Sequence, residues 1–390
     1  MASEIHIPSL DQLRKRKSEK WRRFPEDVLP LPVAEMDYEL APEIKAALID
    51  MVERSDTGYL GPIPELGEAF RAFALDQWGW QVDPKQVRIA VDVGAAAVEV
   101  SRLFVNAGDR ILINSPVYQN FYNWIKELHC EVVDVALIEV ERDGLRTHRL
   151  DMEGIERAYA SGVKVHIICN PHNPLGLLFT REELGQIADL ARQYGVLVIS
   201  DEIHSPLLYD AKDFVPFLDV SENARLVGVA ITSASKAFNL AGLKCAQFIT
   251  ASEQMESKLK ALPEAVHFRS SLFGAIAAVA AFQSSGEWLT LVRKDLERKS
   301  QLLNQLLHRE IPHAYLHRPF FGYLAWIDLR QSGLGDDPGK ELLERGKVAL
   351  NSGHTYGPGG KGFVRFNFAT SAEIIEEAVA RLRKVIGERA

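Results

Sequence analysis

The sequence contains few cysteines, and their placement disfavours several kinds of protein. Only three occur among 390 residues, at Cys130, Cys169 and Cys245. No two of them have the short spacing of zinc-binding or redox-active pairs. A disulfide-stapled secreted fold is therefore disfavoured, and we expect buried, reduced thiols and no metal site in a cytoplasmic protein.

Long hydrophobic runs are also missing. The first ten residues, MASEIHIPSL, lack the apolar core of a signal peptide. The longest apolar run, LFGAIAAVAAF from Leu272, is about half the length that spans a membrane. We expect this run to form a buried, alanine-rich helix, and we expect no membrane partner.

No large block of like charge is present. The chain is 25% charged with a formal net charge of -8, and its one basic run, Arg14–Lys17, is short. We interpret that run as a solvated face and expect no nucleic-acid partner. The chain is 47% hydrophobic and too long for one small core, which favours two domains.

The middle of the chain alternates strand-like and helix-like patterns. Continuous apolar runs at Arg110–Pro116, Val163–Asn170, Gly195–Glu202 and Arg225–Ser233 are typical of strands that are covered on both faces. Thr180–Gly195 reads as an amphipathic helix that begins with a capping box and ends at a glycine. Strand, helix and strand in this rhythm predict a parallel α/β sheet.

The last third of the chain changes character. Strand patterns at Phe320–Arg330 and Lys361–Thr370 are accompanied by helical patterns, which predicts a smaller α+β domain. We predict a large domain over residues 45–280. The small domain would combine residues 281–390 with the N-terminal segment, residues 1–44.

Polar side chains follow the predicted strands where each of them ends. Ligands of an open parallel sheet bind beyond the carboxyl ends of its strands. The residues at these positions are Gly94, Tyr118, Asn170, Asn173, Asp201, His204 and Lys236. We therefore expect an anion cradle, an aromatic ring, amides, a carboxylate and an amine to meet at one edge of the sheet.

This combination of groups matches the needs of pyridoxal phosphate. A lysine in a partly dry site loses its proton readily and becomes a nucleophile that forms an imine. A carboxylate keeps the ring nitrogen protonated, an amide donates to the ring hydroxyl, and a helix N-terminus takes the phosphate. Taken singly, Asp201 reads as a turn cap, Tyr118 as core and the asparagines as a turn. Together they predict a cofactor site.

Several motifs are similar to a known family. CNPHNPLG, SDEIH and SASKAFNLAGLK resemble the fold type I pyridoxal-phosphate enzymes of aminotransferase classes I and II. AEMDY, TGYLGPIPEL and HTYGPGGKGFVRFNFAT narrow the resemblance to the cystathionine β-lyase branch known as the MalY/PatB group. The resemblance covers nearly the whole chain. It implies a large domain with a mainly parallel seven-stranded sheet and a smaller α+β domain.

The resemblance also implies roles around the cofactor ring. Lys236 would bond to the cofactor and act as the catalytic base, and Asp201 would pair with the ring nitrogen. Asn173 would face the ring hydroxyl. His204 lies three residues after Asp201, where many relatives carry tyrosine. Tyr118 would stack on the ring.

Further roles concern the phosphate and the dimer. Val93 and Gly94 would bind the phosphate through their backbone, together with Ser233. Lys244 stands where relatives usually carry arginine, so the charge is kept without the forked geometry. Tyr59 would reach the phosphate of the neighbouring subunit, which implies a homodimer with shared active sites.

The substrate is the part of the resemblance with the most departures. Arg365 would clamp the substrate α-carboxylate through a bidentate contact. Leu175 replaces the usual threonine or isoleucine, and Glu35 replaces the usual aspartate. We expect the side-chain pocket near Tyr323 and the AEMDY segment.

The implied reaction is carbon–sulfur β-elimination on a small amino-acid substrate. Cystathionine or a related S-substituted L-cysteine would give pyruvate, ammonia and a thiol, with Lys236 or Tyr118 protonating the leaving sulfur. Two alternatives remain open from the sequence. One is an aminotransferase, and the other is a regulatory role through protein binding.

Overall fold

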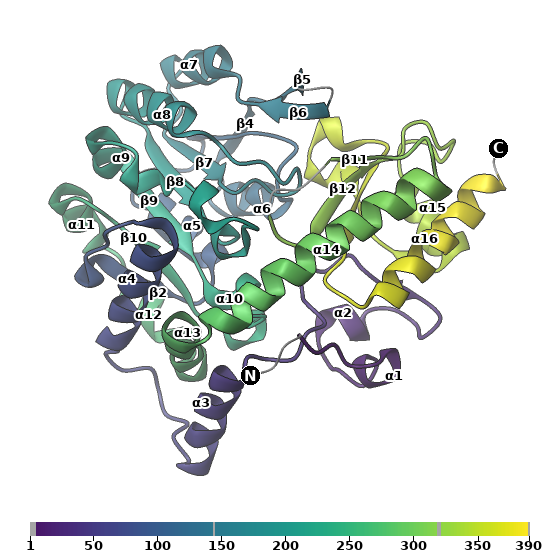
Figure 1. Cartoon of the computed structure of the whole chain (residues 1–390). Helices are drawn as coiled ribbons and strands as arrows, with labels where there is room; N and C mark the ends of the chain where they lie inside the picture. The colour runs from purple at the N-terminus through teal and green to yellow at the C-terminus, as the bar shows by residue number, and fades with distance from the viewer. Residues whose placement is uncertain (1–4, 143–144, 318–320, 389–390) are drawn as a thin grey trace.

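The computed structural model describes residues 5–142, 145–317 and 321–388. Its largest element is a seven-stranded sheet with the order β2-β10-β9-β8-β7-β3-β4 (Figure 1). The strands are β2 (Val87–Ala90), β10 (Ala246–Ile249), β9 (Gly228–Thr232), β8 (Leu197–Asp201), β7 (Val165–Cys169), β3 (Arg110–Ile113) and β4 (Glu131–Asp134). Only β10 runs against its neighbours, so the predicted mainly parallel sheet is confirmed.

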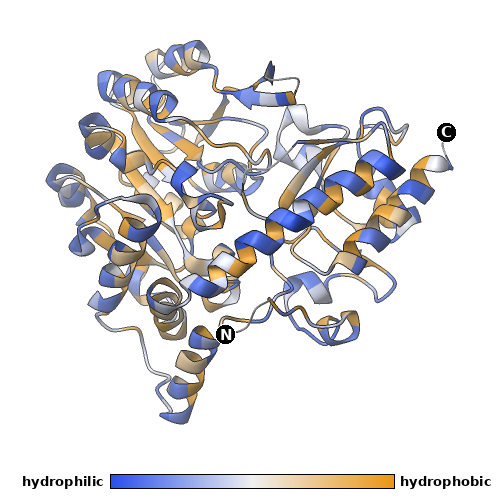
Figure 2. Ribbon diagram, in the orientation of Figure 1, coloured by the Kyte–Doolittle hydropathy of each residue, from blue (hydrophilic) through white to orange (hydrophobic). Residues whose placement is uncertain are grey.

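Helices cover this sheet on both faces. One hydrophobic cluster includes side chains of α4 (Pro64–Trp78), α8 (Arg181–Tyr194) and α13 (Leu272–Ser284). The other includes α5 (Val93–Ser101) and α6 (Asn120–Glu127). Every residue of β7, β8 and β9 is buried between them, which explains their mainly apolar sequences. Figure 2 shows the strands in orange and the surrounding helices with blue outer faces.

Local signals placed most of these elements correctly. Thr180 and Glu183 form the expected capping box of α8, and Gly195 ends the helix at φ +69°. The strand predicted from Arg225 was wrong at its start. Arg225 belongs to α9 (Glu222–Val227), because the Ser221 side chain caps that helix by accepting from the Ala224 amide. The strand begins only at Gly228.

The C-terminal part contains a four-stranded antiparallel sheet. Its order is β11-β12-β15-β14, built from β11 (Tyr315–His317), β12 (Leu324–Asp328), β15 (Phe363–Asn367) and β14 (Asn351–Ser352). The helices of this part are α14 (Gly286–Glu310), α15 (Pro338–Gly346) and α16 (Ala372–Gly387). The predicted C-terminal helix thus ends at Gly387, and its last two positions, 389–390, lie outside the described residues.

The N-terminal segment packs on this C-terminal part. Strand β1 (Leu29–Pro30) pairs in parallel with β13 (Val348–Ala349). The predicted domain limits at 44/45 and 280/281 fall inside α3 (Pro42–Glu53) and α13. A continuous helix moves as one unit, so we propose that the limits lie at the ends of these two helices instead.

The remaining elements are short. They comprise α1 (Leu10–Leu13), α2 (Glu19–Arg22), α7 (Met152–Ala160), α10 (Ala234–Ala237), α11 (Glu253–Leu259), α12 (Ala265–Phe268) and the hairpin of β5 (Ile138–Arg142) with β6 (Leu145–Arg149). Cys169 and Cys245 are buried, whereas Cys130 is only partly so.

The apolar run from Leu272 forms the mostly buried helix α13, as expected. Across the described residues, no single helix has the length and apolarity to cross a membrane. Helices α13 and α14 meet that test only as a pair, which is bent by 82°.

Candidate active site

A cavity of about 770 Å³ lies beyond the carboxyl ends of β7, β8 and β9. It brings together most of the residues that the sequence predicted for one site. Those that line it are Val93, Gly94, Tyr118, Asn173, Asp201, His204, Lys236, Lys244 and Arg365. They come from both sheets and from the loops between them, so the cavity lies where the two parts of the chain meet.

Lys236 lies in the short helix α10, which the Ser233 side chain caps by accepting from the Ser235 amide. The Lys236 Nζ donates to the main-chain oxygen of Ala34 at 3.2 Å. Burial lowers the pKa of Lys236 to about 8, and the positive charge of Arg365 acts in the same direction. A substantial fraction of this amine is therefore neutral just above neutral pH.

Asp201 is the last residue of β8, and its side chain is buried. Its carboxylate accepts from the Ile203 amide at 3.2 Å. Burial raises the pKa of Asp201 to about 7, although this amide and the charge of Lys236 oppose the shift. A cation placed against the carboxylate would favour its ionised form and offset the cost of burial.

His204 and Asn173 lie beside these two groups. Burial lowers the pKa of His204 to about 3, so its ring is neutral. Within the described part of the chain, its Nδ1 is buried without a hydrogen-bond partner. Asn173 accepts from Arg365 Nη1 through its side-chain oxygen at 3.2 Å. Both side chains keep hydrogen-bonding capacity that faces the cavity.

The first turn of α5 lines one side of the cavity. Asp92 caps the helix by accepting from the Ala95 amide, and its other oxygen pairs with Lys244 Nζ at 3.1 Å. A Cβ atom at Gly94 would lie 2.7 Å from Trp124 Nε1, so the close approach of these two elements requires glycine. Free backbone amides and a lysine are suited to a phosphate group.

Arg365 lies on β15 and is buried. Its Nη2 donates to the Pro32 main-chain oxygen at 2.8 Å, and its guanidinium lies 5.3 Å from the centre of the Tyr356 ring. Among the described residues, Arg365 Nε has no hydrogen-bond partner. An unsatisfied buried donor of this kind indicates a missing acceptor, such as a carboxylate.

Tyr118 is half-buried at the cavity wall, with its ring edge-on to Phe121 and Trp124. Its hydroxyl accepts from Asn120 Nδ2 at 2.7 Å. Burial raises the pKa of Tyr118, so the hydroxyl keeps its proton at neutral pH. Its ring is therefore available as an apolar platform with a protonated tip.

Asn170 and Ser233, which were predicted for this site, do not line the cavity. The Asn170 side-chain nitrogen donates to the Val215 main-chain oxygen at 3.2 Å. Ser233 is occupied elsewhere, since its hydroxyl donates to the Cys245 main-chain oxygen at 2.7 Å as well as capping α10. Ser235, two residues later, lines the cavity in its place. Tyr59, which was predicted to reach the site of a neighbouring subunit and not this one, is 93% exposed.

Sequence reasoning missed some of the lining. Asp92 could have been recognised, because an aspartate directly before a helical pattern is a common cap. The segment Pro32–Ala34 also lines the cavity, and its contacts with Lys236 and Arg365 use main-chain oxygens. Every residue carries a main-chain oxygen, so the sequence could indicate only the general location of these contacts, near AEMDY.

Comparison with known proteins agrees with this geometry. The family model for aminotransferase class I and II matches residues 26–382. This chain belongs to that family.

The relatives that it matches cover almost its whole length. The chain is 34% identical to cystathionine beta-lyase of Corynebacterium glutamicum, over 98% of this chain and 100% of that protein. It is 30% identical to cystathionine beta-lyase PatB of Bacillus subtilis, over 95% and 97%. Among solved structures, cystalysin from Treponema denticola, which contains a pyridoxal 5'-phosphate cofactor, superposes with a TM-score of 0.89 at 25% identity, over 96% and 97%.

Proposed function

We propose that this protein is a pyridoxal-phosphate-dependent carbon–sulfur β-lyase that acts on cystathionine or a related S-substituted L-cysteine. The observation that supports the cofactor is the presence of a partly buried amine, Lys236, and a buried carboxylate, Asp201, in the lining of one cavity. Full-length similarity to two cystathionine beta-lyases supports the choice of lyase over aminotransferase.

The residues present fit the cofactor. Asp201 is buried with its pKa raised, as expected for a carboxylate that has no cationic partner against it. The α5 N-terminus and Lys244 provide an anion site at the same cavity. We assign Asp201 to the ring nitrogen, Asn173 and His204 to the ring hydroxyl, and Tyr118 to the ring face.

Pyridoxal phosphate, when bound, would supply an electron sink for the substrate Cα. The chain supplies the binding and the proton transfers. Arg365 holds the substrate α-carboxylate, with its free Nε available for this contact. Lys236 Nζ accepts the Cα proton, a task suited to an amine whose pKa is near 8.

Water is the only further reactant that this elimination and the hydrolysis after it require. The Cα–H bond and the Cβ–S bond break, and the electron pair of the first becomes the new carbon–carbon double bond. The leaving thiolate takes a proton from Lys236 or Tyr118. Hydrolysis of the resulting enamine gives pyruvate and ammonia.

The assembly belongs to the same proposal. We assign the active form to a homodimer in which Tyr59 enters the partner's site. In support, Tyr59 is 93% exposed, in the extended segment between α3 and α4 that projects from the body of the chain (Figure 1). Scattered, unpaired cysteines support a cytoplasmic location. A regulatory role through protein binding stays a prediction.

Product analysis tests the reaction. Purified holoenzyme is incubated with L-cystathionine and no added keto acid. Equal amounts of pyruvate, ammonia and homocysteine are expected. Conversion of the cofactor to its amine form without pyruvate would contradict the lyase and favour an aminotransferase.

A further inference from the structure

The irregular segment 32–37, which we call the strap, contacts both residues assigned to the substrate. The Pro32 main-chain oxygen accepts from Arg365 Nη2 at 2.8 Å, and the Ala34 main-chain oxygen accepts from Lys236 Nζ at 3.2 Å. Tyr323 also donates to Ala34, at 3.1 Å. The position of the strap therefore sets the position of both the amine and the guanidinium.

The strap is neither helix nor strand, and its own backbone makes few hydrogen bonds. The Glu35 amide donates to the Val33 oxygen and the Asp37 amide to the Ala369 oxygen, both at 2.9 Å, so side chains must supply much of the remaining support. Asn239 holds it from the large part of the chain. The Asn239 side-chain oxygen accepts from the Met36 amide at 3.0 Å, and its side-chain nitrogen donates to the Met36 oxygen at 2.9 Å. One amide side chain thus satisfies both backbone groups of one strap residue.

Two features of Asn239 suit this contact. It lies three residues after Lys236, so it ties the strap directly to the loop that carries the amine. Its backbone has φ +59°, a left-handed conformation that asparagine tolerates better than most other residues. A carboxamide is also the side-chain group that matches a peptide unit in donor and acceptor.

Asn367 holds the strap from the small part. Its side-chain nitrogen donates to the Val33 and Glu35 oxygens at 2.6 and 2.7 Å, and the side chain is buried. Asn367 is two residues after Arg365 on β15, so both side chains point to the same face of the sheet. The strap is therefore held by one asparagine near each substrate-handling residue.

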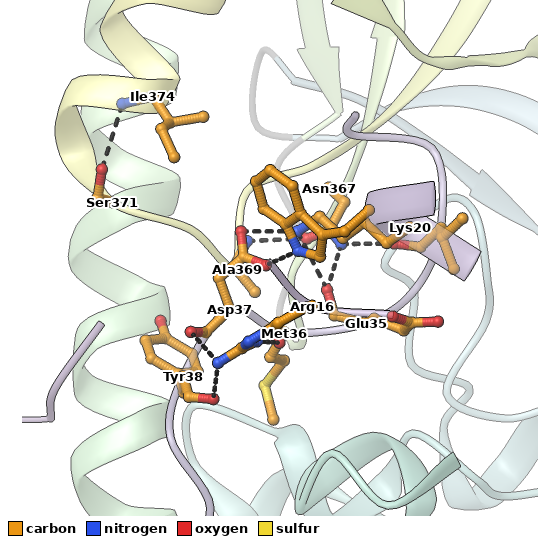
Figure 3. Close-up of polar contacts among 12 residues, drawn as sticks. Arg16, Lys20, Glu35, Met36, Asp37, Tyr38, Asn367, Ala369, Ser371 and Ile374 are labelled. Atoms are coloured by element: carbon orange, nitrogen blue, oxygen red, sulfur yellow. Dashed lines mark hydrogen bonds and ion pairs between the residues drawn. The ribbon is translucent and has the colours of Figure 1, made fainter. Parts of the chain in front are cut away.

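The outer side of the strap is held by α2 and by the segment between α1 and α2, as Figure 3 shows. Arg16 donates to the Met36, Asp37 and Tyr38 oxygens at 3.2 to 3.3 Å. This corrects the interpretation of the basic run as a purely solvated face. Lys20 pairs with Asp37 at 2.8 Å, and neither side chain is exposed.

We propose that Asn239 is a positioning residue. It holds the strap so that the Ala34 and Pro32 oxygens orient Lys236 and Arg365 toward the same amino acid. An amine that donates one N–H to a carbonyl keeps its lone pair free for the Cα proton. The roles of Lys236 and Arg365 rest on the proposed function, whereas the coupling of Asn239 to the strap does not.

Hydrogen exchange of the holoenzyme tests the coupling directly. Asn239→Gly keeps the left-handed backbone and removes both hydrogen bonds to Met36. We expect exchange at the Met36 amide to accelerate about tenfold or more, as for the loss of two neutral hydrogen bonds, while exchange in β7 and β8 stays unchanged. His129→Gly is the matched control, because His129 is exposed at φ +54° and lies far along the chain from the strap.

Steady-state kinetics with L-cystathionine give the second readout. Asn239→Gly should lower kcat/KM about tenfold, with kcat reduced and KM raised, because the amine and the guanidinium both lose their orientation. His129→Gly should match the wild type. Unchanged exchange in the strap, or faster exchange with unchanged kcat/KM, would overturn the proposal.

The design separates this proposal from the proposed reaction. If the wild type makes no pyruvate, the β-lyase assignment fails. The strap is then still tested by hydrogen exchange and by the binding of L-serine, which is measured through the change in cofactor absorbance. If Asn239→Gly does not fold, Arg16→Ala loosens the same strap from its outer side. That variant should also speed strap exchange and weaken L-serine binding, and failure of both effects would refute the inference.

Discussion

The buried ion pair between Lys20 and Asp37 makes a sharp prediction about stability. The Lys20 Nζ lies 2.8 Å from Asp37 Oδ2, and both side chains are fully buried. The other Asp37 oxygen accepts from the Trp21 indole at 3.0 Å, and Lys20 also donates to the Glu35 main-chain oxygen at 3.4 Å. The pair joins α2 to the strap (Figure 3).

Removal of one partner leaves the other charge in a place that water does not reach. Asp37→Ala or Lys20→Met should each lower the free energy of unfolding by about 3–5 kcal/mol. The double change Lys20→Met with Asp37→Asn removes both charges and keeps an acceptor for Trp21. It should cost less than the sum of Lys20→Met and Asp37→Asn, each measured singly, by at least about 2 kcal/mol.

Equilibrium unfolding in urea, followed by tryptophan fluorescence, measures these differences. The matched control is Asp50→Ala, which breaks the pair of Asp50 with Arg54 on α3, where the side chains are 54% and 73% exposed. An exposed pair of this kind contributes well under about 1 kcal/mol. If Asp37→Ala cost no more than Asp50→Ala, the reasoning from burial would be refuted.

Three further predictions concern the cavity and its surroundings. Arg365→Ala should weaken the binding of amino-acid substrates by about 2–4 kcal/mol and so raise their KM. An unchanged KM in steady-state assays would rule out the carboxylate clamp. Gly94→Ala should weaken phosphate binding, because the new Cβ would meet Trp124 at 2.7 Å, and the retained cofactor absorbance after dialysis measures this. Burial raises the pKa of Glu202 to about 8, compared with 4.5 for the ordinary group. Between these values the folded state binds a proton that the unfolded chain does not, so the contribution of Glu202 to stability falls as pH rises from about 5 to 8. In the cofactor-free protein, the free energy of unfolding measured in urea should therefore fall less steeply with pH for Glu202→Gln than for the wild type, by up to about 1.4 kcal/mol per pH unit. An unchanged slope would contradict the buried, protonated carboxyl.

The parts of the fold that follow from sequence are those with local causes. Helix α8 has its cap at Thr180 and its stop at Gly195, and β8 is an unbroken apolar run, so both could be read residue by residue. The start of β9 could not be read in this way, because Arg225 fits the strand pattern of the residues after it. The Ser221 side chain caps α9 and places Arg225 in that helix. There a side-chain cap outweighed the apolar pattern.

The same division applies to the candidate site. Lys236 and Asp201 could be found because each is a polar residue at the end of an apolar strand. The exposure of Tyr59 and the engagement of Ser233 elsewhere depend on long-range packing, which the local pattern does not report. The general location of the strap was predicted from AEMDY, but its contacts with Lys236 and Arg365 were not, since they are made by backbone oxygens that any residue carries.

The electrostatics of Lys236 and Asp201 explain why these two residues suit a cofactor site better than a simple ion pair. Burial lowers the pKa of Lys236 to about 8 and raises that of Asp201 to about 7, so burial favours the neutral form of each, although their mutual attraction opposes both shifts. In the chain alone, neither charge is fully compensated, and both groups titrate close to neutral pH. A cationic ring nitrogen beside Asp201 would restore its negative charge, and an amine whose pKa is lowered to about 8 has more of the neutral form that can form a bond or accept a proton than an ordinary lysine has. The cost of burying both groups is therefore offset only when a ligand with a cationic nitrogen and an electrophilic carbon occupies the cavity.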